Sequence, residues 1–74
     1  MKDKEVIAKK FGRHLKKVRE KHGVTAAELA RRCFLEKSHV SMMESGESNP
    51  TLYTLYKIAD ALEISVEELF EGFE

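Results

Sequence analysis

Residues 24–44 read VTAAELARRCFLEKSHVSMME, and this stretch decides the fold. Thr25 stands three residues before Glu28, which is the spacing of a capping box. In that motif the hydroxyl accepts a hydrogen bond from the backbone of Glu28, and the carboxylate reaches back to the Thr25 amide. A short helix beginning there would bury three residues: Leu29, Ala30 and Cys33. The pattern therefore predicts a capped helix directly before a tight connection.

A second short helix is expected after that connection, over about 36–44. Only Val40 and Met43 are placed to hold it against a core, and its other positions are mostly polar. So narrow an apolar stripe leaves most of the helix surface facing outward. The major groove of DNA is wide enough to admit an α-helix. The stretch over about 25–44 therefore indicates a helix-turn-helix whose second helix enters DNA.

The apolar spacing on either side predicts three more helices. Ile7, Phe11, Leu15 and Val18 form one stripe on a helix of about five turns, which ends at His22-Gly23. After the loop 45–50, Thr51 caps a helix with a buried stripe of Leu52, Leu55, Ile58, Ala59 and Leu62. Ser65 and Glu68 have the form of a second capping box, and the helix that they open is anchored by Leu69 and Phe70. No segment alternates as a strand does, so residues 1–74 are expected to form a single all-α, five-helix domain.

Size and cysteine content exclude several classes of protein. The 74 residues allow one small core, and such a core benefits from dimerisation or dense helix packing. The single cysteine excludes an internal disulfide and offers no pair of metal ligands. No apolar run approaches 18 residues, and the charged N-terminus lacks the apolar stretch of a signal peptide. We therefore expect a cytoplasmic protein without a metal or other cofactor.

Charge is unevenly distributed although the net charge is zero. Residues 1–22 carry nine Lys or Arg against three acidic residues, and residues 44–74 carry one against eight. Two interpretations remain open at this point. The basic end favours a polyanionic partner, whereas two solvated helix faces that attract each other head to tail would give the same distribution.

The chain resembles the helix-turn-helix domains of the phage Cro/repressor (XRE) family over about residues 11–70. It is also similar to the small controller proteins of restriction–modification systems. The matching motifs, in chain order, are LKKVRE (15–20), GVT (23–25), ELA (28–30), VS (40–41), ESG (44–46), NPTL (49–52), Leu55, IA (58–59), AL (61–62) and LF (69–70).

This resemblance implies a homodimer that binds palindromic double-stranded DNA, with the helix over about 36–44 in the major groove. The positions that read bases are then Lys37, Ser38 and Met42, of which lysine donates to guanine and methionine contacts a thymine methyl. The positions near the DNA backbone are Thr25, Ala26, His39, Ser41, Ser48 and Asn49. The helix N-terminus at Thr25, with the free amides of Ala26 and Ala27, suits an anion. Weaker basic candidates for phosphate contact are Arg13, Lys17, Lys21 and Arg31.

The resemblance also implies structural roles. Arg19 and Glu44 match a salt bridge that orients the reading helix against the first helix. Phe70 and Phe73 are expected to anchor the dimer, although Phe73 is also consistent with a frayed terminus. Cys33 stands where a small buried residue is expected, rather than an exposed redox sensor.

Four residues depart from the family pattern. Phe34 replaces the usual glycine of a left-handed turn, so that it either accepts about 1–2 kcal/mol of strain and gains apolar packing, or the turn changes shape. Ala26 replaces a glutamine that contacts phosphate, Glu36 stands at the N-cap of the reading helix, and Glu47 replaces a basic residue. All four changes are expected to weaken DNA binding.

Two other function classes were weighed. The same fold serves in protein-interaction modules such as antitoxins, in which the acidic half 44–74 would be the working surface. An enzyme is not expected, because no acid pair or nucleophile–base pair is placed in a predicted cleft.

Overall fold

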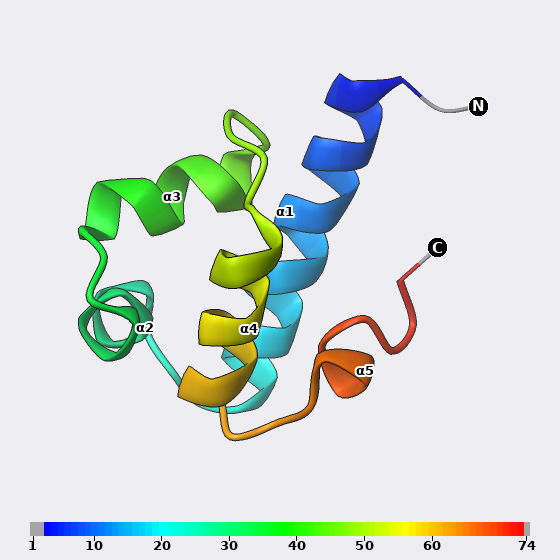
Figure 1. Ribbon diagram of the computed structural model, residues 1–74. Coiled ribbons are helices and arrows are strands. Elements are labelled where there is room, and N and C mark those ends of the chain that lie inside the picture. Colours follow the sequence, from blue (N-terminus) through cyan, green and yellow to red (C-terminus); the bar gives the residue numbers. More distant parts are fainter. Residues whose placement is uncertain (1–2, 74) are drawn as a thin grey trace.

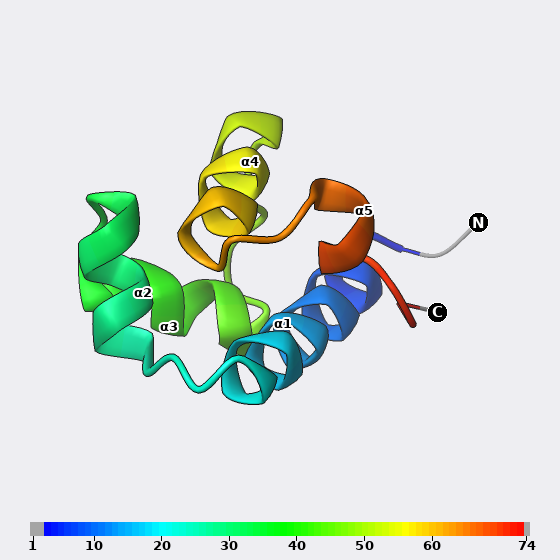
Figure 2. The same cartoon turned by 90° about the horizontal axis from the view of Figure 1, so that it is seen from below.

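Five helices make up the described part of the chain, residues 3–73, in this computed structural model (Figure 1). Their bounds are α1 Lys4–Lys21, α2 Ala26–Cys33, α3 Lys37–Ser45, α4 Leu52–Ala61 and α5 Val66–Leu69. No strand occurs among these residues. In Figure 2, α2 and α3 lie on one side of α4, and α5 lies on the other side. The predicted all-α, five-helix architecture is confirmed.

The helix starts follow the predicted caps, with one correction. The hydroxyls of Thr25, Thr51 and Ser65 each accept a hydrogen bond from the backbone three residues later. At Ser65 the capping box is complete, because the Glu68 carboxylate also accepts from the Ser65 amide. The complete box predicted at Thr25 is wrong: only the hydroxyl half forms, at 3.1 Å, since the Glu28 carboxylate is bound by arginines instead.

The core is built from all five helices around fully buried side chains: Leu15, Leu29, Val40, Met43, Ile58 and Leu69. The predicted burial of Leu52 is wrong, because its side chain is 68% exposed. Leu52 lies three residues before Leu55, which rotates it by about 60° away from that residue around an α-helix. This places it on the flank of the stripe rather than within it. Ile7, also predicted in a buried stripe, is 43% exposed at the beginning of α1.

Helices α1 and α3 approach each other closely at Gly12. A Cβ atom at Gly12 would lie 2.5 Å from the carbonyl oxygen of Met43 and even closer to that of Glu44. The missing side chain therefore lets the C-terminal end of α3 rest on the backbone of α1. This contact fixes the direction in which α3 leaves the domain.

Candidate nucleic-acid interface

Helix α3 is held by the two anchors that the sequence predicts. Val40 and Met43 have no exposed surface. The side chains of Lys37, Ser38 and Ser41 face solvent, Met42 is 43% exposed, and His39 is half-buried. The structure thus brings the predicted base-reading residues onto one outward helix surface.

The turn between α2 and α3 keeps its left-handed geometry despite Phe34. This residue has φ 57° and ψ 38°, and the next amide, that of Leu35, bonds back to the Ala30 carbonyl at 2.9 Å. The Phe34 side chain is 92% exposed. Of the two predicted outcomes, the strain is therefore accepted, and the expected gain in apolar packing is absent from the chain itself.

The N-terminus of α2 opens beside this surface. The first hydrogen bond of the helix runs from the Leu29 amide to the Thr25 carbonyl, so the amides of Ala26 and Ala27 precede it. Ala27 is exposed and Ala26 is half-buried. Such amides, together with the positive end of the helix dipole, can bind a phosphate.

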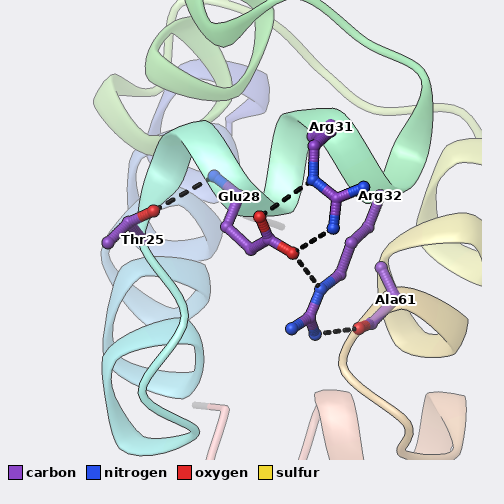
Figure 3. A network of polar contacts seen from close by, with 5 residues as sticks. All are labelled: Thr25, Glu28, Arg31, Arg32 and Ala61. Carbon is purple, nitrogen blue, oxygen red and sulfur yellow. Dashed lines mark hydrogen bonds and ion pairs between the residues drawn. The ribbon is translucent and has the colours of Figure 1, made fainter.

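A network centred on Glu28 lies along α2 (Figure 3). Its carboxylate accepts from Nε of Arg31 at 3.0 Å and from Nε of Arg32 at 2.8 Å, and Arg32 also donates to the Ala61 carbonyl at 2.8 Å. The hydrogen bonds from Arg31 and Arg32 lower the pKa of Glu28 to about 2. Arg31, predicted as a possible phosphate contact, is thus already paired, and Arg32 joins α2 to the end of α4. The sequence analysis missed this second role, although Glu28 and Arg32 have the i,i+4 spacing that favours such a pair.

The predicted salt bridge between Arg19 and Glu44 is present. The two nitrogen–oxygen distances are 2.7 and 3.0 Å, and a third donor of Arg19 reaches the Val24 carbonyl at 2.9 Å. Both side chains are about nine-tenths buried. The hydrogen bond to Glu44 raises the pKa of Arg19, so the pair stays charged. It joins α1, the α1–α2 loop and the end of α3 into one rigid unit.

The loop after α3 begins at Gly46, which has φ +83°. Its amide and that of Glu47 bond back to Met43 and Met42, which closes the helix. Asn49 is exposed as predicted for a phosphate contact. The hydroxyl of Ser48 is instead enclosed and has no hydrogen-bond partner in the described residues. A phosphate contact by Ser48 is therefore left to its backbone amide.

Phe70 and Phe73 attach the C-terminal segment to α1. The centroid of the Phe11 ring lies 5.6 Å from that of Phe70 and 6.4 Å from that of Phe73, and His14 lies 5.4 Å from Phe73. His14 also bonds to the Leu69 carbonyl at 2.6 Å. Phe73 is thus a packed residue rather than a frayed terminus, and the predicted role of both rings in a dimer rests on their remaining exposed edges.

Other candidate chemistry is limited in residues 3–73. Cys33 is buried as predicted, and burial raises the pKa of its thiol. In this range, no group of three or more His, Cys, Asp or Glu side chains is arranged to hold a metal ion. The other basic candidates, Arg13, Lys17 and Lys21, all lie exposed on α1. No described helix combines the length and apolarity needed to span a membrane.

A capped α2, a tight turn and an outward α3 fixed by a buried ion pair define a helix-turn-helix protein of the DNA-binding class. The family described as "Helix-turn-helix" matches residues 15–69. The chain belongs to this family of DNA-binding transcription regulators, of the XRE type.

Three relatives illustrate the range of the family. An uncharacterized HTH-type transcriptional regulator, y4dJ, of Sinorhizobium fredii is 36% identical over 85% of this chain and 82% of its own length. Control protein C.MunI of a Mycoplasma species is 36% identical over 88% of this chain and 89% of its own length. Antitoxin HipB of Escherichia coli is 36% identical over 70% of this chain and 59% of its own length.

A solved structure agrees with the same assignment. The restriction–modification controller protein C.AhdI of Aeromonas hydrophila superposes with a TM-score of 0.87 and 35% identity. The match covers 93% of this chain and all of that one. The resemblance to controller proteins that the sequence predicts is therefore found both in sequence and in structure.

Proposed function

We propose that this protein is a sequence-specific transcription regulator that binds a palindromic operator as a homodimer. The observation that carries the proposal is the outward polar surface of α3, held from beneath by Val40 and Met43. Lys37 and Ser38 read base edges from the first turn of α3, and Met42 packs against a thymine methyl. Two copies of α3 then occupy successive major grooves about 34 Å apart.

Phosphate contacts hold the protein in register. The amides of Ala26 and Ala27, with Thr25, bind one phosphate, and Asn49 and the amide of Ser48 bind another. Ser41 and half-buried His39 border the same path. Glu36 and Glu47 are both exposed and lower the affinity by repelling the DNA backbone.

The experiment is selection of bound sequences from a random duplex pool, followed by titration of the selected site. We expect a palindrome and a dissociation constant that rises steeply with salt. Lys37→Ala should reduce the preference for this site over random DNA by about 10-fold or more, since a good base contact contributes about 1–3 kcal/mol. Lys57→Ala, on α4, is the matched control and should leave the preference unchanged. Binding without site preference and without salt dependence would contradict the proposal.

A second candidate is an antitoxin or other partner-binding module on the same fold. The similarity to antitoxin HipB favours it. Its test is affinity purification of the tagged protein from its native host. Recovery of one stoichiometric protein partner, together with no preferred DNA site, would replace the first proposal with this one.

A further inference from the structure

An apolar surface without a partner in the chain lies on the flank of α4 that faces α5. The exposed fractions are 68% for Leu52, 55% for Tyr56 and 43% for Ile7 of α1. Leu52 and Tyr56 are four residues apart and so are neighbours on the helix surface. We name these three residues, together with half-buried Leu55 and Phe70, the α4 patch. Tyr53, with its ring 5.1 Å from the Lys57 ammonium, lies at its rim.

The patch contains both a ridge and a groove. Leu52 and Tyr56 form the ridge. Beside them a groove of about 180 Å³ is lined by Ile7, Leu55, Pro50 and Phe70, among others. The opposite flank of α4 is already covered, because the backbone of Lys57 and Ala61 contacts α2. Figure 2 shows α2 and α5 on these two sides of α4.

We propose that the α4 patch is the dimer interface and that its occupant is the same patch of a second copy of this chain. A two-fold interface pairs one surface with itself and so must be self-complementary. A ridge next to a groove meets this need, since each copy can place Leu52 and Tyr56 against the groove of the other. The inference rests on the proposed function, which requires a dimer.

Charge at the two ends of the patch agrees with this pairing. Lys4 begins α1, and Asp60 lies near the end of α4, four residues after Tyr56. In Figure 1 the start of α1 and the end of α4 lie at opposite ends of the molecule. Within residues 3–73, neither Lys4 nor Asp60 forms an ion pair. Two copies related by a two-fold axis therefore bring the basic end of one patch to the acidic end of the other.

Area and position agree as well. The largest apolar patch of a typical monomer is about 300–600 Å² and is often functional, and two tyrosines and a leucine give the α4 patch this size. It can form the apolar centre of a contact that buries about 800 Å² per partner. None of its residues belongs to α2 or α3. A dimer formed here leaves both DNA-contacting helices open, whereas Phe70 contributes only its exposed edge and Phe73 remains packed on α1.

The test is sedimentation equilibrium without DNA, on the wild type, Tyr56→Glu and Phe34→Glu. Phe34 is the matched control, because it is the more exposed aromatic residue and receives the same new charge outside the patch. We expect a wild-type dimer at tens of µM, an unchanged dimer for Phe34→Glu, and a dissociation constant raised at least about 100-fold by Tyr56→Glu, since the charge would be buried without a partner. Circular dichroism checks that the Tyr56 variant is folded, and Leu52→Lys is the second variant if it is not.

A monomeric wild type at about 500 µM, or a Tyr56→Glu protein as dimeric as the wild type, would overturn the inference. So would a dimer that Phe34→Glu disrupts and Tyr56→Glu does not. Because no DNA is present, these outcomes leave base reading by α3 to its own experiment. Conversely, a dimer that depends on Tyr56 but shows no preferred DNA site would uphold the interface and contradict the proposed function.

Discussion

At Phe34 the chain holds a bulky residue in a backbone conformation that favours glycine. The left-handed region costs a residue with a side chain about 1–2 kcal/mol, and a ring that is 92% exposed returns little packing energy. The turn keeps its shape because its hydrogen bonds and the buried residues on both sides, Cys33 and half-buried Leu35, determine it. Strain at one residue is thus balanced by its neighbours rather than by its own contacts.

Phe34→Gly should therefore stabilise the protein. We expect a gain of about 1 kcal/mol in the free energy of unfolding, because the relief of strain exceeds the greater freedom of glycine in the unfolded chain. Phe34→Ala is the control, since it removes the ring but keeps the strained Cβ, and its effect should be near zero. Urea denaturation measures both. Equal stabilities of the glycine and alanine variants would show that backbone strain is not the cause.

Between elements, the contact of α1 with α3 depends on Gly12. In an isolated helix, Gly→Ala is stabilising by about 1 kcal/mol. Here the new Cβ would lie within 2.5 Å of two backbone carbonyl oxygens of α3, which cannot move aside as a side chain can. Gly12→Ala should consequently lower the free energy of unfolding by about 1–3 kcal/mol. Thermal unfolding gives the sign, and a rise in melting temperature would contradict the close approach.

The ion pairs of α2 predict a dependence of stability on acid. The pKa of Glu28 is about 2 in the folded protein and ordinarily 4.5. Above about pH 4.5 the carboxylate is charged in both states, and its pairing with Arg31 and Arg32 stabilises the fold in full. As the pH falls from 4.5 to 2, the unfolded chain takes up the proton first, so this contribution is lost.

Glu28→Gln should lack that loss. The stability difference between wild type and variant is expected to be constant from pH 7 to 5 and to shrink steadily below pH 4.5. Urea midpoints measured from pH 7 to 2.5 follow this difference, which cancels the titration of the other carboxylates. Two curves that remain parallel down to pH 2.5 would mean that the arginines do not hold the charge of Glu28.

The elements themselves could be predicted where a local rule determines them. Thr25, Thr51 and Ser65 cap helices as expected because the cap lies within three residues of its acceptor. Burial of Leu52 could not be predicted, since helical spacing gives the direction of a side chain but not the place where the neighbouring helix ends. The Glu28 carboxylate likewise had two partners within reach. Two guanidinium groups bind it more strongly than one amide does, and the sequence does not show which contact prevails.

At the scale of the whole molecule, the uneven charge acquires a second meaning. The basic residues of α1 and the acidic residues of the last third of the chain lie largely exposed, and both features seemed at first to be alternatives: attraction to a polyanion or attraction between faces. Arg19 joins its helix to α3 through a buried pair, but the exposed charges beside the α4 patch remain available between copies. The two interpretations are compatible, because α3 faces away from the patch through which a second copy would bind.

A core of this size benefits from assembly, and the proposed dimer should therefore appear in the stability of the whole domain. For a protein that unfolds from a dimer to two unfolded chains, a tenfold rise in concentration adds about 0.7 kcal/mol per chain, which corresponds to about 3–5 °C in melting temperature for a domain of this length. We expect such a shift for the wild type between 5 and 500 µM, on the order of twice that value over the two decades. The Tyr56→Glu protein should melt at one temperature throughout this range, because its folded monomer has no partner to gain from mass action. Differential scanning calorimetry at each concentration gives the comparison. A wild-type melting temperature independent of concentration would mean that the fold is stable without a partner, and that the α4 patch is exposed for another reason.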